Sequence, residues 1–167
     1  MIRDNELIFA AAQSPTTTDT CLSTNVYDSG PLASSPFANT GRDFGAGTPL
    51  YLEIVITTSG LSAATASQIN FQLITAGNVG MTSPTVMVES LAQSATSYIA
   101  TSASAAVQQT RIVLPVPPGT ETQAWKQYIA VNCKITLGVL SALAYNAYIT
   151  AMPSTFRFYA PGWKLDA

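Results

Sequence analysis

In four stretches of the chain, every second residue is apolar. They are residues 50–57, 69–73, 128–135 and 143–149. Successive side chains of an extended strand point to opposite faces of a sheet, so this period puts one set on a core and the other outward. Turn-forming sequences separate the stretches, at 29–31, 45–47, 59–60, 76–78 and 117–119. The pattern predicts an all-β fold, a sandwich or a barrel, and of these we expect an antiparallel β-sandwich.

Three segments lack this period. Residues 14–20 form a polar link, and residues 29–49, rich in Gly, Pro, Ser and Asn, predict a long loop. Residues 90–110 are mostly Ala, Ser, Thr and Gln, which fit a short helix or a soft strand equally. We expect a single domain over 1–167, with an N-terminal arm over about 1–13 and a C-terminal extension over about 152–167.

The chain is poor in charge and has no histidine. Seven basic and nine acidic residues give a net charge of −2, and the basic residues are scattered. Nucleic-acid binding requires clustered Lys and Arg, so we expect no nucleic-acid partner. Without histidine, neither a Ser-His-Asp triad nor an imidazole metal ligand is available. We therefore expect no catalysis, no cofactor and no metal; a hydrolase that uses paired carboxylates is a minor alternative, since the acids read as dispersed surface residues.

The two cysteines, Cys21 and Cys133, lie far apart in the sequence and leave two alternatives open. They could pair, but a cytosolic context favours two buried thiols. The most apolar stretch, 137–152, is interrupted by polar residues and is shorter than the roughly 20 residues that span a bilayer. Two acids precede the first apolar stretch, which argues against a secretory signal. We expect no membrane partner.

The low charge points to protein partners. A folded chain of 17.5 kDa exposes on the order of 8,000 Å², so the charges are spread at roughly one per 500 Å², fewer than a free soluble surface carries. Much of the exterior is therefore expected to contact other protein.

Candidate contact residues lie in three places, and two of them leave alternatives open. Arg42 and Asp43 could pin their own loop or meet a partner, and the aromatic tail could be a last strand or an arm on a neighbour. The candidates are Arg3, Asp4, Glu6, Leu7 and Phe9 in the N-terminal segment, Arg42, Asp43 and Phe44 in the loop, and Phe156, Arg157, Tyr159 and Trp163 in the tail.

Five segments, in this order and spacing, carry a family resemblance: Asp4–Gln13, Ser23–Asp28, Arg42–Tyr51, Ile69–Leu73 and Leu114–Glu121. Together they resemble the capsid cement (decoration) proteins of tailed bacteriophages, in particular the family related to the cement protein of a Bordetella phage. The resemblance covers about residues 4–150. The chain departs from the pattern at 29–41, which looks like an insertion, and at 152–167, which looks like an extension, so no contacts are carried over there.

The resemblance implies a jelly-roll-like β-protein that binds the outside of the phage capsid and reinforces it. Its partners would be the major capsid protein and copies of itself, as a dimer or trimer. It would be made in the host bacterial cytoplasm and end on the capsid exterior. A carbohydrate-binding or receptor-binding β-sandwich is the alternative; it would need clustered exposed aromatics, and Tyr51, Tyr98, Trp125 and Trp163 are dispersed in the sequence. For Trp125, which precedes an alternating stretch, we expect a place in the core or at a sheet end.

Overall fold

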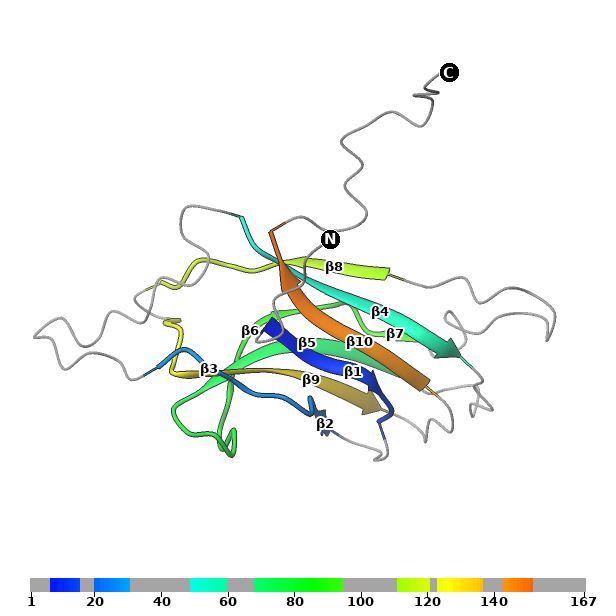
Figure 1. Cartoon of the computed structure of the whole chain (residues 1–167), viewed down its shortest axis with the longest axis horizontal. Coiled ribbons are helices and arrows are strands. Elements are labelled where there is room, and N and C mark those ends of the chain that lie inside the picture. Colours follow the sequence, from blue (N-terminus) through cyan, green and yellow to red (C-terminus); the bar gives the residue numbers. More distant parts are fainter. Residues whose placement is uncertain are drawn as a thin grey trace, which may run out of the picture.

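A computed structural model describes residues 7–15, 20–30, 49–59, 68–94, 111–120, 123–136 and 143–151. Within these ranges the chain forms ten β-strands and no helix. The strands make two antiparallel sheets that pack face to face (Figure 1). The all-β fold predicted from the alternation is confirmed, and of the two expected architectures the structure is the sandwich.

The first sheet, sheet A, contains four strands. These are β1 (Ile8–Gln13), β10 (Leu143–Thr150), β4 (Tyr51–Ser59) and β8 (Arg111–Pro115), in that order across the sheet. Its two central strands, β10 and β4, are the longest of the four and pair along their whole lengths. β1, at the edge, pairs irregularly with β10, with register shifts on both sides of Ala10. Bulges of this kind twist an edge away from other chains.

The second sheet, sheet B, contains six strands. β9 (Tyr128–Thr136) and β5 (Gln68–Ala76) form its centre. Two short strands, β2 (Thr20–Leu22) and β3 (Tyr27–Asp28), follow one another along the free side of β9. β6 (Thr85–Glu89) and β7 (Gln93–Ser94) do the same on the free side of β5.

The strands pair in a nested order. β1 pairs with β10, β2 with β9, β4 with β8, and β5 with β6. The outer pairs of this nest enclose the inner ones, and contacts between β10 and β4 and between β9 and β5 then join the pairs into two sheets. The double sheet is therefore not a series of consecutive hairpins: among the described strands, only β5 and β6 are both consecutive and paired.

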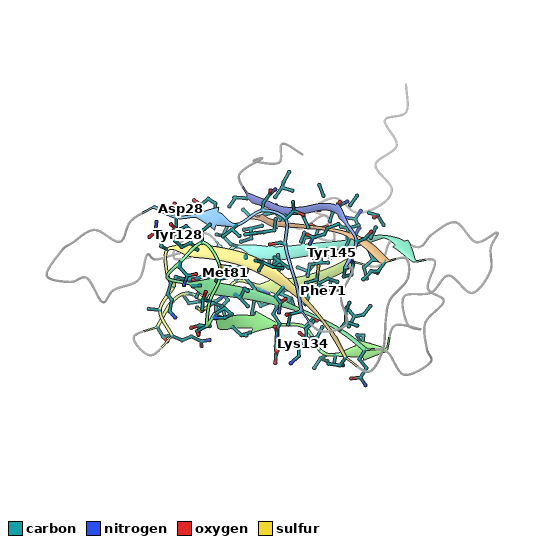
Figure 2. The ribbon with its side chains drawn as sticks, turned by 90° about the horizontal axis from the view of Figure 1, so that it is seen from below. Asp28, Phe71, Met81, Tyr128, Lys134 and Tyr145 are labelled. Carbon is teal, nitrogen blue, oxygen red and sulfur yellow. The ribbon has the colours of Figure 1, made fainter. Side chains whose placement is uncertain are left out.

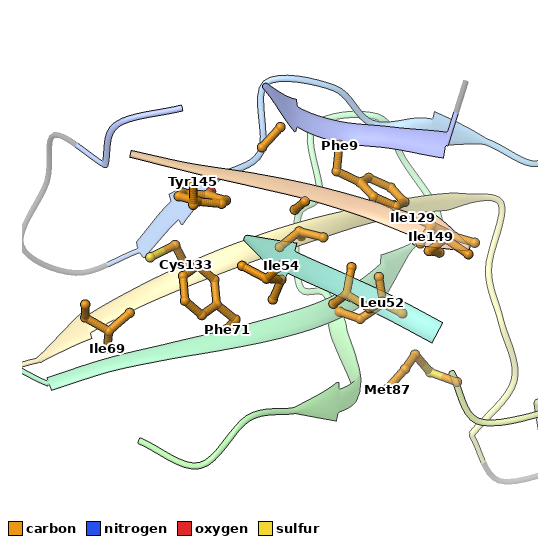
Figure 3. Close-up of a cluster of buried hydrophobic side chains, with 14 of the residues drawn as sticks. Phe9, Leu52, Ile54, Ile69, Phe71, Met87, Ile129, Cys133, Tyr145 and Ile149 are labelled. Atoms are coloured by element: carbon orange, nitrogen blue, oxygen red, sulfur yellow. The ribbon is translucent and has the colours of Figure 1, made fainter. Parts of the chain in front are cut away.

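The core lies between the sheets and uses the apolar set of each alternating stretch. Leu52, Ile54 and Ile56 of β4 are at most 1% exposed. Phe71 of β5 meets Tyr145 of β10 edge to face, with ring centroids 5.1 Å apart (Figure 3). Such aromatic pairs add stability beyond the apolar area that they bury.

Trp125 is part of the same core, as the sequence predicted. It is 1% exposed, and its indole Nε1 donates a hydrogen bond of 3.1 Å to the Pro117 carbonyl. That partner satisfies the one polar atom of a side chain that is otherwise apolar.

A second, smaller hydrophobic cluster lies on the outer face of sheet B, at one end. It comprises Ile74, Ala76, Ala130 and Met81. Met81 belongs to the loop between β5 and β6, which returns over the sheet end (Figure 2). The loop makes this turn with left-handed backbone at Met81 and Ser83, at φ of 50° and 49°.

The outer face of sheet A differs from the expectation. The period-two pattern placed Glu53 and Val55 outward on β4, and the nine acids were expected on the surface. Glu53 is 0% exposed, Val55 is 5% and Tyr148 on β10 is 2%. The alternation correctly predicts which residues share a face of the sheet. On sheet A, however, these three residues face away from the core and are still shielded from water.

Several predicted segments lie partly or wholly outside the described residues. Of the predicted arm, residues 8–13 form β1 and belong to sheet A. Of 90–110, only 90–94 are described, and they include the short strand β7. Most of the 29–49 loop and the extension over 152–167 fall outside the described ranges.

Candidate functional site: an open groove beside β3

An open groove of about 660 Å³ lies where three parts of the chain converge. They are the start of β1, the segment that joins β2 to β3 and continues through β3, and the tip of the β5–β6 loop. The lining residues are Ile8, Thr24, Asn25, Val26, Tyr27, Asp28 and Val79. Asp28 lies next to Tyr128 at one end of the sandwich (Figure 2).

The segment between β2 and β3 separates from β9 at Ser23, whose side-chain hydroxyl accepts a hydrogen bond that a backbone carbonyl accepts in a regular ladder. Ser23 N donates to the Val131 carbonyl at 2.7 Å, and Val131 N donates at 3.1 Å to the Ser23 hydroxyl instead of to a carbonyl. The Ser23 hydroxyl in turn donates to the Asn25 carbonyl at 2.8 Å. The ladder is thus closed at Ser23, and the next residues are free to line a groove.

Asn25 fixes this segment to the opposite sheet. Its backbone N donates to the Phe9 carbonyl at 3.0 Å, and its side-chain Nδ2 donates to the Ile8 carbonyl at 2.9 Å. Both acceptors belong to β1, so Asn25 joins the edges of the two sheets at the floor of the groove. These bonds fix the backbone on which Ile8 and Val26 are presented.

The side chain of Asp28, another lining residue, is held by two hydrogen bonds. Its Oδ1 accepts from the Gly30 backbone N at 2.8 Å and from Gln127 Nε2 at 3.0 Å. Gly30 has a φ of 83°, a conformation that favours glycine. The Asp28 carboxylate therefore has a structural role, and it is the one acidic side chain among the lining residues.

The third wall is Val79, which is 64% exposed. The turn beneath it is held by Asn78, whose backbone carbonyl accepts from Met81 N at 3.1 Å and whose Oδ1 accepts from Thr82 N at 3.1 Å. A fixed turn that presents an exposed valine offers a preformed apolar contact. The groove thus combines apolar side chains with the Asp28 carboxylate.

The strongest electrostatic feature lies elsewhere, on the outer face of sheet A. Arg111 Nη1 and Glu53 Oε1 form an ion pair at 2.8 Å. The Glu53 side chain is 0% exposed, whereas that of Arg111 is 34% exposed. A buried carboxylate needs such a cation to offset its lost hydration, so we assign the pair a structural role.

The core also contains groups whose ionisation is suppressed. Burial, and secondarily the nearby Cys21, raises the pKa of the Cys133 thiol to about 12. Burial, with smaller effects from Cys133 and Cys21, raises the pKa of Tyr145 far above its usual range. Both groups are therefore neutral at physiological pH. In the described part of the chain, no group of three or more His, Cys, Asp or Glu side chains could hold a metal ion.

Two of the twelve candidate contact residues can be placed. Phe9 is 1% exposed, so its side chain fills the core, and Leu7 packs partly buried against the same core. Ile8, between them, is the one that lines the groove. Outside the described residues lie Arg3, Asp4, Glu6, Arg42, Asp43, Phe44, Phe156, Arg157, Tyr159 and Trp163.

Sequence reasoning did not identify the groove. Residues 23–28 were used only for the family resemblance, and nothing in the sequence connects them to Val79. A possible local signal was the run of Ser, Thr and Asn at 23–25 between two short extended segments, which favours side-chain-to-backbone hydrogen bonds and a break in a strand.

The chain matches no protein-family model and no curated protein. The part of the chain that the structure describes contains no candidate membrane-spanning helix.

Proposed function

We propose that this protein is a structural component of a phage virion: a decoration protein that binds the outer surface of the capsid, bridges major capsid subunits and stabilises the shell. The proposal rests on the family resemblance of five segments and on the low charge of the chain. The single observation that supports it best is the nested strand order of the sandwich. We propose further that this sandwich is a jelly roll, because the resemblance implies that fold and the nested pairing agrees with it.

A protein in this role needs no bond chemistry. Packaged DNA pushes capsid subunits apart, and a molecule that binds across their seams must be removed before they separate. A protein that binds only the assembled shell stabilises it by mass action. Repetition of one contact over a symmetric lattice then adds many modest affinities together.

The experiment is to mix the purified full chain with capsids that lack it and to sediment the particles. We expect saturable binding at stoichiometric copy number, with decorated capsids releasing DNA at a higher temperature than bare ones. Capsids that bind the protein without any gain in thermal resistance would contradict the reinforcing role. Absence of binding would contradict the proposal as a whole.

Two exposed apolar residues test whether the groove takes part in binding. Val79 lines the groove, whereas Leu91, 81% exposed, does not. Val79→Asp should weaken capsid binding by about tenfold if the groove is the contact, which corresponds to losing roughly one well-packed side chain. Leu91→Asp is the matched control and should bind normally. Equal binding by both variants would place the contact elsewhere on the protein.

A carbohydrate-binding module is the second candidate, and one observation favours it. The groove combines an aromatic ring, Tyr27, with Asn25 and Asp28, the residue types that sugar sites use. Thr24 is exposed at the same groove, so Thr24→Trp should fill it. Glycan binding that Thr24→Trp abolishes would favour this candidate, and a glycan array without signal would dismiss it.

A further inference from the structure

The two cysteines are direct cross-strand neighbours. β2 pairs antiparallel with β9 in a register that places Cys21 opposite Cys133. Both thiols are free. The Cys133 side chain lies in the core between the sheets, beside Phe71 (Figure 3), and Cys21 packs against the same core cluster. The two side chains therefore point to the same side of sheet B.

The backbone separation suits a disulfide. Ser23 N donates to the Val131 carbonyl, which makes this pair a hydrogen-bonded position of the ladder. Positions alternate along an antiparallel pair, so Cys21 and Cys133, two residues further, are again a hydrogen-bonded position, where Cα atoms lie about 5.5 Å apart. A disulfide requires Cα atoms roughly 4.4–6.8 Å apart, which this position satisfies, and the two Cβ atoms must then approach within about 4.5 Å as the bond closes.

The two thiols differ in access. Cys133 is 0% exposed. Cys21 is half-buried in a three-residue edge strand, between the exposed residues Thr20 and Leu22. Its Sγ lies 3.5 Å from Gln13 Nε2 of β1. Cys21 is thus the thiol that a reagent from solution meets first, and Cys133 lies behind it.

We propose that Cys21 and Cys133 are a disulfide-forming site that closes by exchange with a small disulfide such as oxidised glutathione. In the first step the Cys21 thiolate attacks a glutathione sulfur, forms a mixed disulfide and releases one glutathione thiolate. In the second, the Cys133 thiolate attacks Cys21 Sγ, breaks the mixed disulfide and releases a second glutathione. Two protein thiols are oxidised, one glutathione disulfide is reduced, and the two thiol protons pass to the released glutathiones. Because Cys133 is buried in the core, we expect the second step to be the slower one.

The cross-link would join the second strand of the fold to its next-to-last strand. These strands are far apart in the sequence, so the bond closes a long loop and restricts the unfolded chain strongly. For a domain of this size we expect the melting temperature to rise by about 10 °C. This inference concerns the fold and does not depend on the proposed function.

The test uses the full chain treated with oxidised glutathione at mildly alkaline pH. Intact-mass measurement should show the loss of two hydrogen atoms, and peptide mapping without reductant should join the peptides that contain residues 21 and 133. The melting temperature should rise and return to its starting value after treatment with dithiothreitol. A persistent glutathione adduct on Cys21, disulfide-linked dimers or unchanged thiols would each overturn the proposal.

A shifted thiol provides the control. In a Cys21→Ser, Thr20→Cys double variant the free thiol moves by one residue and therefore to the opposite face of β2. Both substituted positions are at least partly exposed, so we expect the variant to fold, which its circular dichroism will check. We expect Cys at position 20 to form a mixed disulfide with glutathione and no disulfide with Cys133. A cross-link in this variant would show that β2 is too mobile for the register to specify the pairing, and would overturn the geometric basis of the proposal.

Discussion

The outer faces of the two sheets come from the same period-two sequence pattern, but their side chains lie in different environments. On sheet A, Glu53, Val55 and Tyr148 are all buried, and the one charged group among them is paired with Arg111. On sheet B, a row of polar side chains crosses the strands: Asn132 Nδ2 donates to Gln72 Oε1 at 2.9 Å, and Gln72 Nε2 donates to Glu89 Oε2 at 3.0 Å.

The difference shows two ways to make an outward sheet face stable. The row on sheet B satisfies its polar groups within itself and borders water at the exposed Glu89 (Figure 2 shows the neighbouring Lys134 pointing away from the sandwich). Sheet A buries its outer residues and neutralises the carboxylate with a cation. On sheet B, Gln72 and Asn132 of the row are also buried, and so is the cluster around Ile74. Outside these places, substitutions on the outer face of sheet B should cost less than equivalent substitutions on sheet A.

Two tyrosines test this comparison with the largest expected effect. Tyr148 is 2% exposed on the outer face of sheet A, whereas Tyr128 is half-buried on the outer face of sheet B. Tyr148→Ala should lower the free energy of unfolding by about 3 kcal/mol, because it leaves a cavity in a buried site. Tyr128→Ala should cost about 1 kcal/mol, since the ring is already partly solvated. Urea denaturation measures both, and equal losses would contradict the distinction between the faces.

The ion pair gives the next effect. Arg111→Ala removes the cation 2.8 Å from a fully buried carboxylate and should cost about 2 kcal/mol, less than for a fully buried pair because Arg111 is partly exposed. The matched control is Lys134→Ala, which removes an exposed cation from sheet B and should change stability little. Thermal melts at low and high salt distinguish the two variants. The loss caused by Arg111→Ala should depend little on salt, since burial shields the Arg111–Glu53 pair from added salt.

The alternation in the sequence predicts the strands that form the centre of each sheet. The predicted stretches at 50–57, 69–73, 128–135 and 143–149 correspond to β4, β5, β9 and β10, within a few residues at their ends. These strands are eight or nine residues long, enough to show a period. β2, β3, β6, β7 and β8 have two to five residues each, too few for a period to stand out, and they are fixed by pairing with a central strand.

What the sequence does not show is the environment of a face and the convergence of distant segments. Nothing in the letters around Glu53 distinguishes a buried carboxylate from a solvated one, because its partner Arg111 is remote in the sequence. The groove could not be predicted for the same reason. Ile8, Tyr27 and Val79 line it together only because strand pairing places β1, β3 and the β5–β6 loop side by side. At the β1 edge of sheet A, the protection against pairing with other chains is likewise a pair of register shifts, which the sequence does not display.

The polar row on sheet B predicts a smaller effect. Gln72→Leu keeps the size of the side chain but removes the acceptor of Asn132, which is only 8% exposed, and the donor to Glu89. The loss should be about 1 kcal/mol, the usual value for removing one partner of a partly buried hydrogen bond. Gln93→Leu, on exposed β7 of the same sheet, is the control and should have little effect. If Gln72→Leu is neutral or stabilising, the row is dispensable and this face tolerates apolar residues as sheet A does.

The smallest predicted effect has the opposite sign and concerns the loop that covers the apolar end of sheet B. A Cβ added at Gly77 meets no atom within 4 Å. Its φ lies outside the left-handed region, so Gly77→Ala should stabilise the protein by about 0.5 kcal/mol through the lower entropy of the unfolded chain. At Gly119 the added Cβ would lie 3.1 Å from Cδ1 of the buried Trp125, so Gly119→Ala should not stabilise and should cost stability if the indole cannot shift. Because Gly77 begins the segment that carries Met81 onto sheet B, a gain at Gly77 without a change in the urea m-value would show that this cover is preserved and that the effect acts on the unfolded chain.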